Sequence, residues 1–324
     1  MVQETVSQVC REEVRLRWRM KYTMEDLAFL KNGRAQQHKS SEPVTGKVCV
    51  VSGATSGVGL EAVKQLAKGG AKLVFVGRSQ QKLDQIKAQL ERDYATSADL
   101  VVADFARLAD VRRAAEEINA RYDVIDILIN SAGIHSTKRL LSEDGNELVF
   151  QVNHLAPFLF TILLLDRVKR SVQGRIIQVN SEGHRFGGLK MSDLDWKSRF
   201  YVGLRAYGAS KTAQLMTVIK LADQLKDTNV TINAMHPGGV RTNIGSNNGW
   251  LYRAWLHGVI WHFLKDPVIS GESLYYLAAA PELSRSTGKY FNLTIDEKPM
   301  PHALDETVRE QIWVKSHELV GLEL

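Results

Sequence analysis

The sequence predicts an α/β fold, a doubly wound parallel sheet of about seven strands with helices on both faces. Short runs rich in β-branched residues alternate with longer stretches of helical periodicity, which is the pattern of parallel strands and their crossovers. The first run is followed at once by a glycine-rich turn and then a helical stretch. A chain of 324 residues, 44% of them hydrophobic, is long enough to bury such a sheet.

The composition excludes several classes of protein. Charged residues make up 24% of the chain and the formal net charge is +6, which is ordinary for a soluble globular protein. The basic residues are scattered, apart from a group between Arg11 and Lys21, and no nucleic-acid-binding module or metal-ligand motif is visible. Cys10 and Cys49 are too few for a disulfide framework, so a reducing compartment is expected.

The start of the chain bears on its location. The first 30 residues are charged throughout and show no signal peptide. No uncharged apolar run approaches the roughly 18 residues of a membrane span. We therefore expect a cytoplasmic protein, and peripheral contact with a membrane surface stays open as an alternative.

Residues 1–44 are predicted to be an N-terminal extension, and residues 45–324 the main domain. Residues 24–30 could form a short helix with Thr23 as its N-cap, and the polar run 36–43 is typical of a linker. The extension either packs against the main domain or docks on a membrane or a partner.

The first predicted strand, 47–51, leads into a glycine loop and a helix at 60–68. Gly53 allows a sharp turn, Gly57 lets the backbone approach a pyrophosphate, and Gly59 lets helix and strand pack closely. The free amides at the start of the helix would meet the phosphates. The predicted contacts from this loop to a dinucleotide are Gly53, Thr55, Ser56, Gly57, Val58 and Gly59.

The end of the second strand, 73–76, indicates which dinucleotide is bound. A carboxylate here would hold the two ribose hydroxyls of NAD(H), but Gly77 occupies that place and Arg78 follows. A guanidinium pairs well with a 2′-phosphate, so NADP(H) is expected rather than NAD(H). The alternative is that Arg78 is an ordinary surface arginine.

The remaining strands end in polar or small residues that should line the same edge of the sheet. Asp104, before Phe105, either accepts from the adenine amino group or caps the next helix. The small residues after the fourth strand let the nicotinamide half of the cofactor lie close to the backbone. The predicted strands are 100–103, 124–129, 175–179, 230–235 and 289–293, the helices are 107–122, 147–170 and 303–320, and the further cofactor contacts are Asp104, Phe105, Asn130, Ala132, Gly133, Pro237, Gly238, Val240 and Thr242.

Tyr207 and Lys211 are four residues apart in a stretch of helical pattern, so they lie on one helix face. An ammonium beside a phenol favours the phenolate, and we therefore expect the pKa of Tyr207 to fall toward neutrality. A tyrosine of this kind can exchange a proton with a substrate oxygen. Ser181 follows the fifth strand at the same sheet edge and can donate to that oxygen. Asn153, within 147–170, either holds a water in a proton relay or is satisfied structurally.

Residues 245–268 are predicted to form a substrate lid. The segment is densely aromatic and apolar, and it includes Trp250, Trp255 and Trp261. A lid over an apolar pocket, a dimer contact and a membrane-touching helix are the three alternatives.

With these motifs in this order, the chain from about residue 47 onward resembles the short-chain dehydrogenase/reductases, and within them the retinol-dehydrogenase-like members. The resemblance implies a Rossmann fold and NADP(H)-dependent interconversion of an alcohol and a carbonyl in a lipophilic, retinol-, steroid- or aldehyde-like substrate. It implies that Lys211 also binds the nicotinamide ribose, and it leaves a homo-oligomer open. The motifs that carry it are the loop from Ser52 to Gly59, Asn130 to Gly133, Asn153, Ser181, Tyr207 with Lys211, and His236 to Gly238.

The chain departs from the family pattern beside the catalytic serine. The usual Ser-Ser pair is Asn180-Ser181 here, and Glu182 follows. Both changes could reshape the substrate pocket. A second hypothesis is a non-catalytic NADP(H)-binding sensor or scaffold, although such a protein would not need Asn153, Ser181, Tyr207 and Lys211 together.

Overall fold

The computed structural model describes residues 28–240 and 265–324. The chain divides into two compact units, residues 1–35 and 36–324. The described part of the first unit contains helix α2 (Ala28–Asn32). The first residues of the second unit are held by hydrogen bonds to the rest of that unit. The backbone amide of His38 donates to Thr294 Oγ1 at 2.8 Å, and Val44 N donates to Gly69 O at 3.0 Å.

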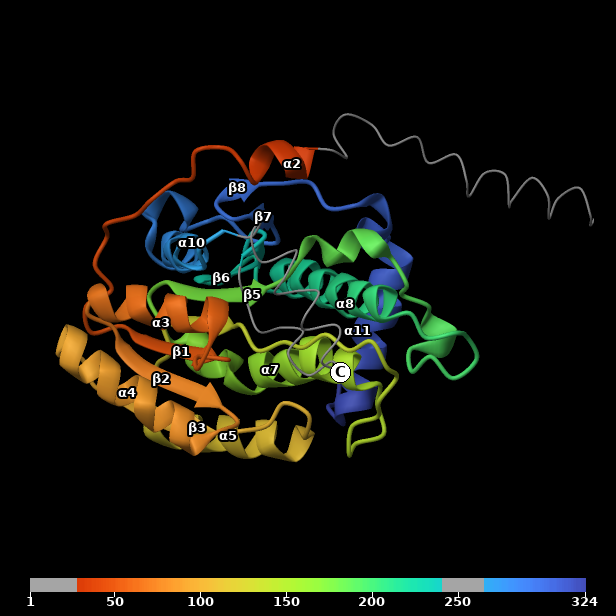
Figure 1. Ribbon diagram of the computed structural model, residues 1–324, viewed down its shortest axis with the longest axis horizontal. Helices are drawn as coiled ribbons and strands as arrows, with labels where there is room; N and C mark the ends of the chain where they lie inside the picture. The colour runs from red at the N-terminus through yellow and green to blue at the C-terminus, as the bar shows by residue number, and fades with distance from the viewer. Residues whose placement is uncertain (1–27, 241–264) are drawn as a thin grey trace, which may run out of the picture. The chain divides into compact units, whose positions relative to one another are not determined.

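The second unit is built on a mostly parallel sheet, as predicted (Figure 1). In the described residues it has eight strands in the order β3-β2-β1-β4-β5-β6-β7-β8, and the first seven are parallel. The eighth strand was not anticipated, and it pairs antiparallel with β7. The strands are β1 (Val48–Ser52), β2 (Lys72–Gly77), β3 (Ala98–Val102), β4 (Ile127–Asn130), β5 (Gly174–Val179), β6 (Val230–His236), β7 (Tyr290–Asn292) and β8 (Ile295–Asp296).

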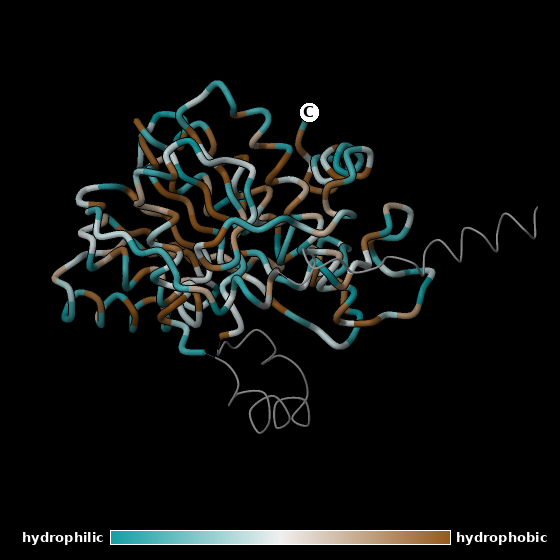
Figure 2. The backbone as a smooth tube through the Cα atoms, turned by 90° about the horizontal axis from the view of Figure 1, so that it is seen from above, coloured by the Kyte–Doolittle hydropathy of each residue, from teal (hydrophilic) through white to brown (hydrophobic). Residues whose placement is uncertain are grey.

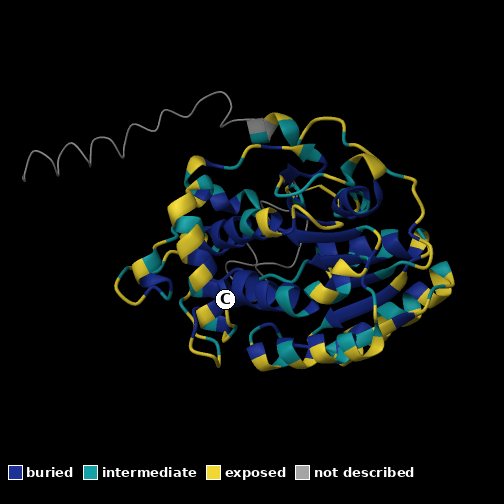
Figure 3. Cartoon of the chain, turned by 180° about the vertical axis from the view of Figure 1, so that it is seen from behind, coloured by how far each residue is buried: buried dark blue, intermediate teal, exposed yellow. Residues whose placement is uncertain are grey.

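Helices cover both faces of this sheet, because successive strand residues point to opposite sides. Val50 and Leu128 pack on one face, while their neighbours Cys49 and Ile127 pack on the other. In Figure 2 the strands are the hydrophobic, central part of the second unit, and Figure 3 shows that the same elements are buried. The first face holds α5 (Leu108–Arg121), α7 (Ala156–Lys169), α8 (Gly203–Gln224) and α11 (Glu306–Val320), and the second holds α3 (Gly57–Lys68), α4 (Gln80–Tyr94) and α10 (Val268–Ala279).

The predicted helix 147–170 is not a uniform α-helix. It consists of α6 (Leu148–Phe150), a π-helical turn η1 (Gln151–Leu155) and α7. Contrary to our expectation, the stretch Leu148–Lys169 has the length and hydropathy of a membrane span. Because 78% of the apolar window is buried inside the protein, it serves as the core helix of the first face.

The predicted lid at 245–268 lies outside the described residues except for its last four positions. Lys265 forms an isolated bridge with Val240, and α10 begins at Val268. The strand order reverses between β1 and β4, and ligands of such sheets bind at the carboxyl ends of the strands at this point.

Candidate active site

Ser181 and Tyr207 meet at the carboxyl end of β5. Ser181 follows that strand directly, and its Oγ accepts from the backbone amide of Gly183 at 3.0 Å. Tyr207 lies in the first turns of α8, which spans residues 203–224, and its ring and Ser181 Oγ both lie next to the α-carbon of Gly183. Gly183 belongs to the 3₁₀ turn η2 (Glu182–Phe186), which packs against α8. The structure therefore brings these two predicted residues together, at the edge expected.

Lys211 lies one turn after Tyr207, but its ammonium is directed elsewhere. Nζ donates to the Val179 carbonyl at 2.8 Å and to Gln214 Oε1 at 3.3 Å, and it lies 5.9 Å from the centroid of the Tyr207 ring. Burial lowers the pKa of Lys211 to about 7.

The expected fall in the pKa of Tyr207 is wrong for the protein as it stands here. Burial raises the pKa of Tyr207 to about 12, and the nearby Ser181 side chain opposes this rise only in part. The physical reason is that desolvation of the phenolate outweighs an ammonium that is held by Val179 and is itself easily deprotonated.

Asn153 lies fully buried in the π turn η1. Its Oδ1 accepts from Ile134 N at 2.8 Å, and its Nδ2 donates to Ile134 O at 2.9 Å and to Ser210 Oγ at 3.1 Å. Ser210 in turn donates to the carbonyl of Tyr207 at 2.7 Å. Both amide hydrogens of Asn153 are thus used within the protein, which favours the structural alternative for its side chain.

The glycine loop between β1 and α3 has the geometry that the sequence predicted. Gly53 and Gly57 adopt φ angles of +71° and +55°, where residues with a side chain are strained. A Cβ atom on Gly53 would lie 2.7 Å from Ala132 N, and one on Gly59 would lie 2.3 Å from Gly53 O. Only glycine fits at these positions, and the loop therefore lies tightly against the residues that follow β4.

The region after β4 is held by buried hydrogen bonds. Asn130 Nδ2 donates to Thr161 Oγ1 at 2.9 Å, and Ser52 Oγ lies 3.4 Å from both Asn130 Oδ1 and Ala132 N. Gly133 has no side chain, and a Cβ there would lie 3.3 Å from Asn153 Oδ1. These contacts connect the predicted cofactor contacts to the Asn153 amide.

The end of β2 carries no carboxylate and has little room for one. A Cβ on Gly77 would lie 3.3 Å from Leu83 and 3.4 Å from Thr55. Arg78 follows, is exposed, and forms no ion pair with any described residue. The guanidinium is therefore open to an anionic ligand.

The side chains of the two residues after β3 are both engaged in contacts within the protein. Asp104 Oδ1 accepts from Ala106 N at 3.0 Å, whereas the residue that caps α5 is Arg107, so Asp104 closes the turn before the helix. The side chain of Phe105 is buried against Phe160, with ring centroids 5.6 Å apart. Only the backbone of Phe105 is left for a cofactor.

The turn after β6 is fixed in place. Gly238 has a φ of +80°, Pro237 O accepts from Ser270 Oγ at 2.6 Å, and the side chain of Val240 is buried. Thr242 lies outside the described residues.

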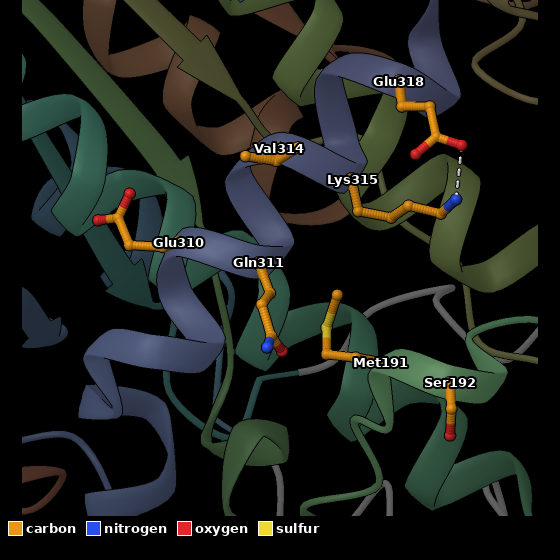
Figure 4. A pocket seen from close by; sticks show the side chains of 7 residues that line it. All are labelled: Met191, Ser192, Glu310, Gln311, Val314, Lys315 and Glu318. Atoms are coloured by element: carbon orange, nitrogen blue, oxygen red, sulfur yellow. Dashed lines mark hydrogen bonds and ion pairs between the residues drawn. The ribbon is translucent and has the colours of Figure 1, made fainter.

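An open depression in the described part of the chain lies elsewhere (Figure 4). It has a volume of about 600 Å³ and lies between α11 and the short turn η3 (Met191–Asp193). Lys315 and Glu318 pair across its rim at 2.7 Å. None of the residues that line it belongs to the predicted site.

Comparison with known proteins agrees with this geometry. The sequence model described as short chain dehydrogenase matches residues 47–249. The chain belongs to the short-chain dehydrogenase family. It is 35% identical to human retinol dehydrogenase 13 over 298 residues, which are 88% of this chain and 87% of that protein. Human retinol dehydrogenase 14 is 34% identical over 293 residues, which are 86% and 87% of the two chains.

A solved structure shows the same fold. The crystal structure of an uncharacterized protein from Mycobacterium paratuberculosis superposes with a TM-score of 0.71 and 26% identity, over 89% of this chain and 99% of that one. The family and its retinol-dehydrogenase-like branch are thus confirmed. The enzymes of this family are oxidoreductases that act on alcohols and carbonyls with NAD(H) or NADP(H).

Sequence reasoning missed three residues that shape this site. Gly183 lies against the Tyr207 ring, and Arg185 and Glu297 form a buried ion pair beside it. The proximity of Gly183 to Ser181 in the sequence was visible, but the packing of its α-carbon on the ring was not. No spacing rule brings Arg185 and Glu297 together, because 112 residues separate them.

Proposed function

We propose that this protein interconverts an alcohol and a carbonyl by hydride transfer with NADP(H), and that Tyr207 is the general acid and base. The observation that carries the proposal is that the side chains of Tyr207 and Ser181 lie next to each other, at the same sheet edge as the glycine loop. Two neighbouring hydroxyl groups can receive a substrate oxygen between them.

The residues present fit a dinucleotide. Gly53, Gly57 and Gly59 remove every Cβ that would obstruct the loop, and the amides at the start of α3 can bind a pyrophosphate. Arg78 supports the choice of NADP(H), because its exposed guanidinium follows Gly77 at the ribose end of the crevice. When bound, the nicotinamide supplies or accepts the hydride at the substrate carbon.

The chain's own residues handle the proton and the orientation. Ser181 donates to the substrate oxygen and orients it, while Tyr207 gives or takes the proton at that oxygen. Burial disfavours the charge on Lys211, whose pKa is near 7, but where the ammonium is present its charge would lower the pKa of Tyr207 from its raised value of about 12. Asn153 fixes the carbonyl of Tyr207 through Ser210, and a water held at Asn153 stays a prediction.

We propose a lipophilic substrate. The relatives at 34–35% identity bear the name retinol dehydrogenase. The segment between Ser181 and Tyr207 also exposes apolar side chains, with Phe186 at 52%, Phe200 at 88% and Leu204 at 53% exposure. A cytoplasmic location, peripheral membrane contact and a homo-oligomer stay predictions.

The test is a panel of aldehydes, ketones and alcohols, run with NADPH or NADP⁺ and with NADH or NAD⁺ and followed by absorbance of the reduced nicotinamide. We expect turnover that prefers NADP(H). Tyr207→Phe should lower kcat by at least about 100-fold and leave the Kd for NADPH unchanged, since the phenol acts on the proton. Binding of NADPH without turnover of any substrate would favour the scaffold instead. Full activity of Tyr207→Phe would overturn the mechanism.

A further inference from the structure

The turn that follows Ser181 carries a buried group of charges. Arg185 Nε donates to Glu182 Oε2, and Arg185 Nη2 donates to Glu297 Oε1 at 2.5 Å. The side chains of Glu182, Arg185 and Glu297 are only 16%, 13% and 2% exposed. Glu297 lies just after β8, at the far end of the chain from η2.

Other bonds from the C-terminal part of the chain meet the same turn. The Tyr290 hydroxyl donates to Glu182 Oε1 at 2.7 Å, and Asn292 Nδ2 donates to Glu297 Oε2 at 3.0 Å. His184 accepts from Met300 N through Nε2 at 3.3 Å, so its Nδ1 carries the proton and donates to the carbonyl of Ser181 at 2.9 Å. The segment from Tyr290 to Met300 therefore holds the turn that contains the Ser181 carbonyl.

Within this group Arg185 has two carboxylate partners on different elements. Its guanidinium presents Nε to one carboxylate and Nη2 to the other, a geometry that a planar fork supplies and a single ammonium does not. Without Arg185 the two buried carboxylates would lose the cation that compensates them, and they would separate or take up water.

A displacement of the turn η2 would also displace the side chains of Ser181 and Tyr207. The amide of Gly183 donates to Ser181 Oγ, and the α-carbon of Gly183 packs on the Tyr207 ring, where an added Cβ would lie 2.5 Å from Cε1. Neither the hydroxyl of Ser181 nor the ring of Tyr207 can stay in place if η2 shifts.

We propose that Arg185 is a positioning residue: by joining Glu182 to Glu297 it holds the turn that sets the Ser181 and Tyr207 hydroxyls relative to each other. The inference rests on the proposed function, and it adds a C-terminal segment to the machinery of that site. Arg185 does not need to touch substrate or cofactor for this role.

The test compares Arg185→Ala and Arg185→Lys with the wild type, on a substrate that the wild type turns over. Because a shift of about 1 Å can cost 100-fold, Arg185→Ala should lower kcat by about 10- to 100-fold while the Kd for NADPH stays within a factor of about two. Arg185→Lys should recover part of the loss in kcat. In the cofactor-free protein, amide exchange at residues 183–187 should speed up in Arg185→Ala and speed up less in Arg185→Lys.

Arg167→Ala is the matched control. Arg167 is also partly buried, at 23% exposure, and binds both a carboxylate, Asp123 at 3.3 Å, and a backbone carbonyl, Asn119 at 3.0 Å. It lies on α7 and contacts none of the catalytic residues named above, so its loss should lower thermal stability without lowering kcat. The inference is wrong if folded Arg185→Ala keeps the wild-type kcat and exchange rates, or if Arg167→Ala loses kcat equally. Absence of turnover in the wild type would instead refute the proposed function, and the exchange measurement would still decide the role of Arg185.

Discussion

The α-carbon of Gly183 lies against the ring of Tyr207, and an added Cβ would come within 2.5 Å of Cε1 and 2.7 Å of Cδ1. No side chain fits this gap unless the ring or the turn moves. We therefore expect Gly183→Ala to lower kcat by about 10- to 100-fold, because the displaced phenol no longer faces the substrate oxygen. Steady-state kinetics and a fluorescence titration with NADPH would measure the two effects separately.

Gly187→Ala is the control for that substitution. Gly187 closes the same turn with a φ of +64°, and nothing lies within 4 Å of its added Cβ. The change strains the backbone without reaching the ring, so it should cost stability and little kcat. Equal kcat in Gly183→Ala and the wild type would contradict the packing described here.

Arg78 should decide between the two dinucleotides. Its guanidinium is exposed, and there is little room for a carboxylate side chain at its neighbour Gly77. Because a hydrogen bond to a charged group contributes about 1.5–3 kcal/mol, Arg78→Ala should raise the KM for NADPH by about 10- to 100-fold and leave the KM for NADH unchanged. Arg92→Ala, which removes an exposed arginine on α4 that pairs with Asp93, should change neither constant. A uniform rise in both KM values would show that Arg78 does not recognise the 2′-phosphate.

Lys211 should give the cofactor-free protein a stability that rises with pH. Burial lowers its pKa from 10.5 to about 7, so between these values the unfolded chain binds a proton that the folded chain does not. Stability therefore increases as pH rises from 7 toward 10, and below pH 7 the cost of burying the ammonium is present in full. Urea unfolding at pH 7, 8 and 9 should show this slope in the wild type and a smaller one in Lys211→Met. Parallel slopes would rule out a depressed pKa.

His154 should produce the same trend in the acid range, where stability again rises with pH. Burial lowers its pKa from 6.5 to about 3, and its ring is fully buried with Nε2 2.7 Å from Ser316 Oγ. As pH falls below 6.5, His154 binds a proton in the unfolded chain but not in the folded one, so stability is lost between pH 6.5 and 3. His154→Gln should lose less stability than the wild type when thermal unfolding at pH 7 is compared with that at pH 5. The prediction fails if the two proteins lose stability equally over that range.

Much of the fold was predictable because buried parallel strands consist of short runs rich in β-branched residues, which are recognisable in the sequence. The seven parallel strands lie within about three residues of the predicted ranges. Strand β8 was missed because it has two residues and follows Leu293, whose φ of +57° makes a turn without glycine. The helices α4 and α10 were not anticipated either.

The site was predictable in its members but not in its electrostatics. Spacing along α8 correctly gave Tyr207 and Lys211 neighbouring positions on one face. It could not show that the ammonium turns to the Val179 carbonyl, nor how far burial would raise the pKa of the phenol. Those properties depend on atoms of β5, more than two dozen residues away in the sequence.

The π turn at Gln151–Leu155 has a consequence for the length of this part of the chain. Such a turn holds one residue more than an α turn, so it offsets the residues before it from those after it by about 100° around the helix axis. Phe150 and Phe158, which flank the turn and are eight residues apart, both pack in the same core cluster. Because the extra residue brings them nearly into line, deleting one residue from the turn would leave a plain α-helix with both anchors still facing the core. The turn is therefore the place where this helix can lose one residue without losing its packing, although the loss would move Asn153, which lies within the turn.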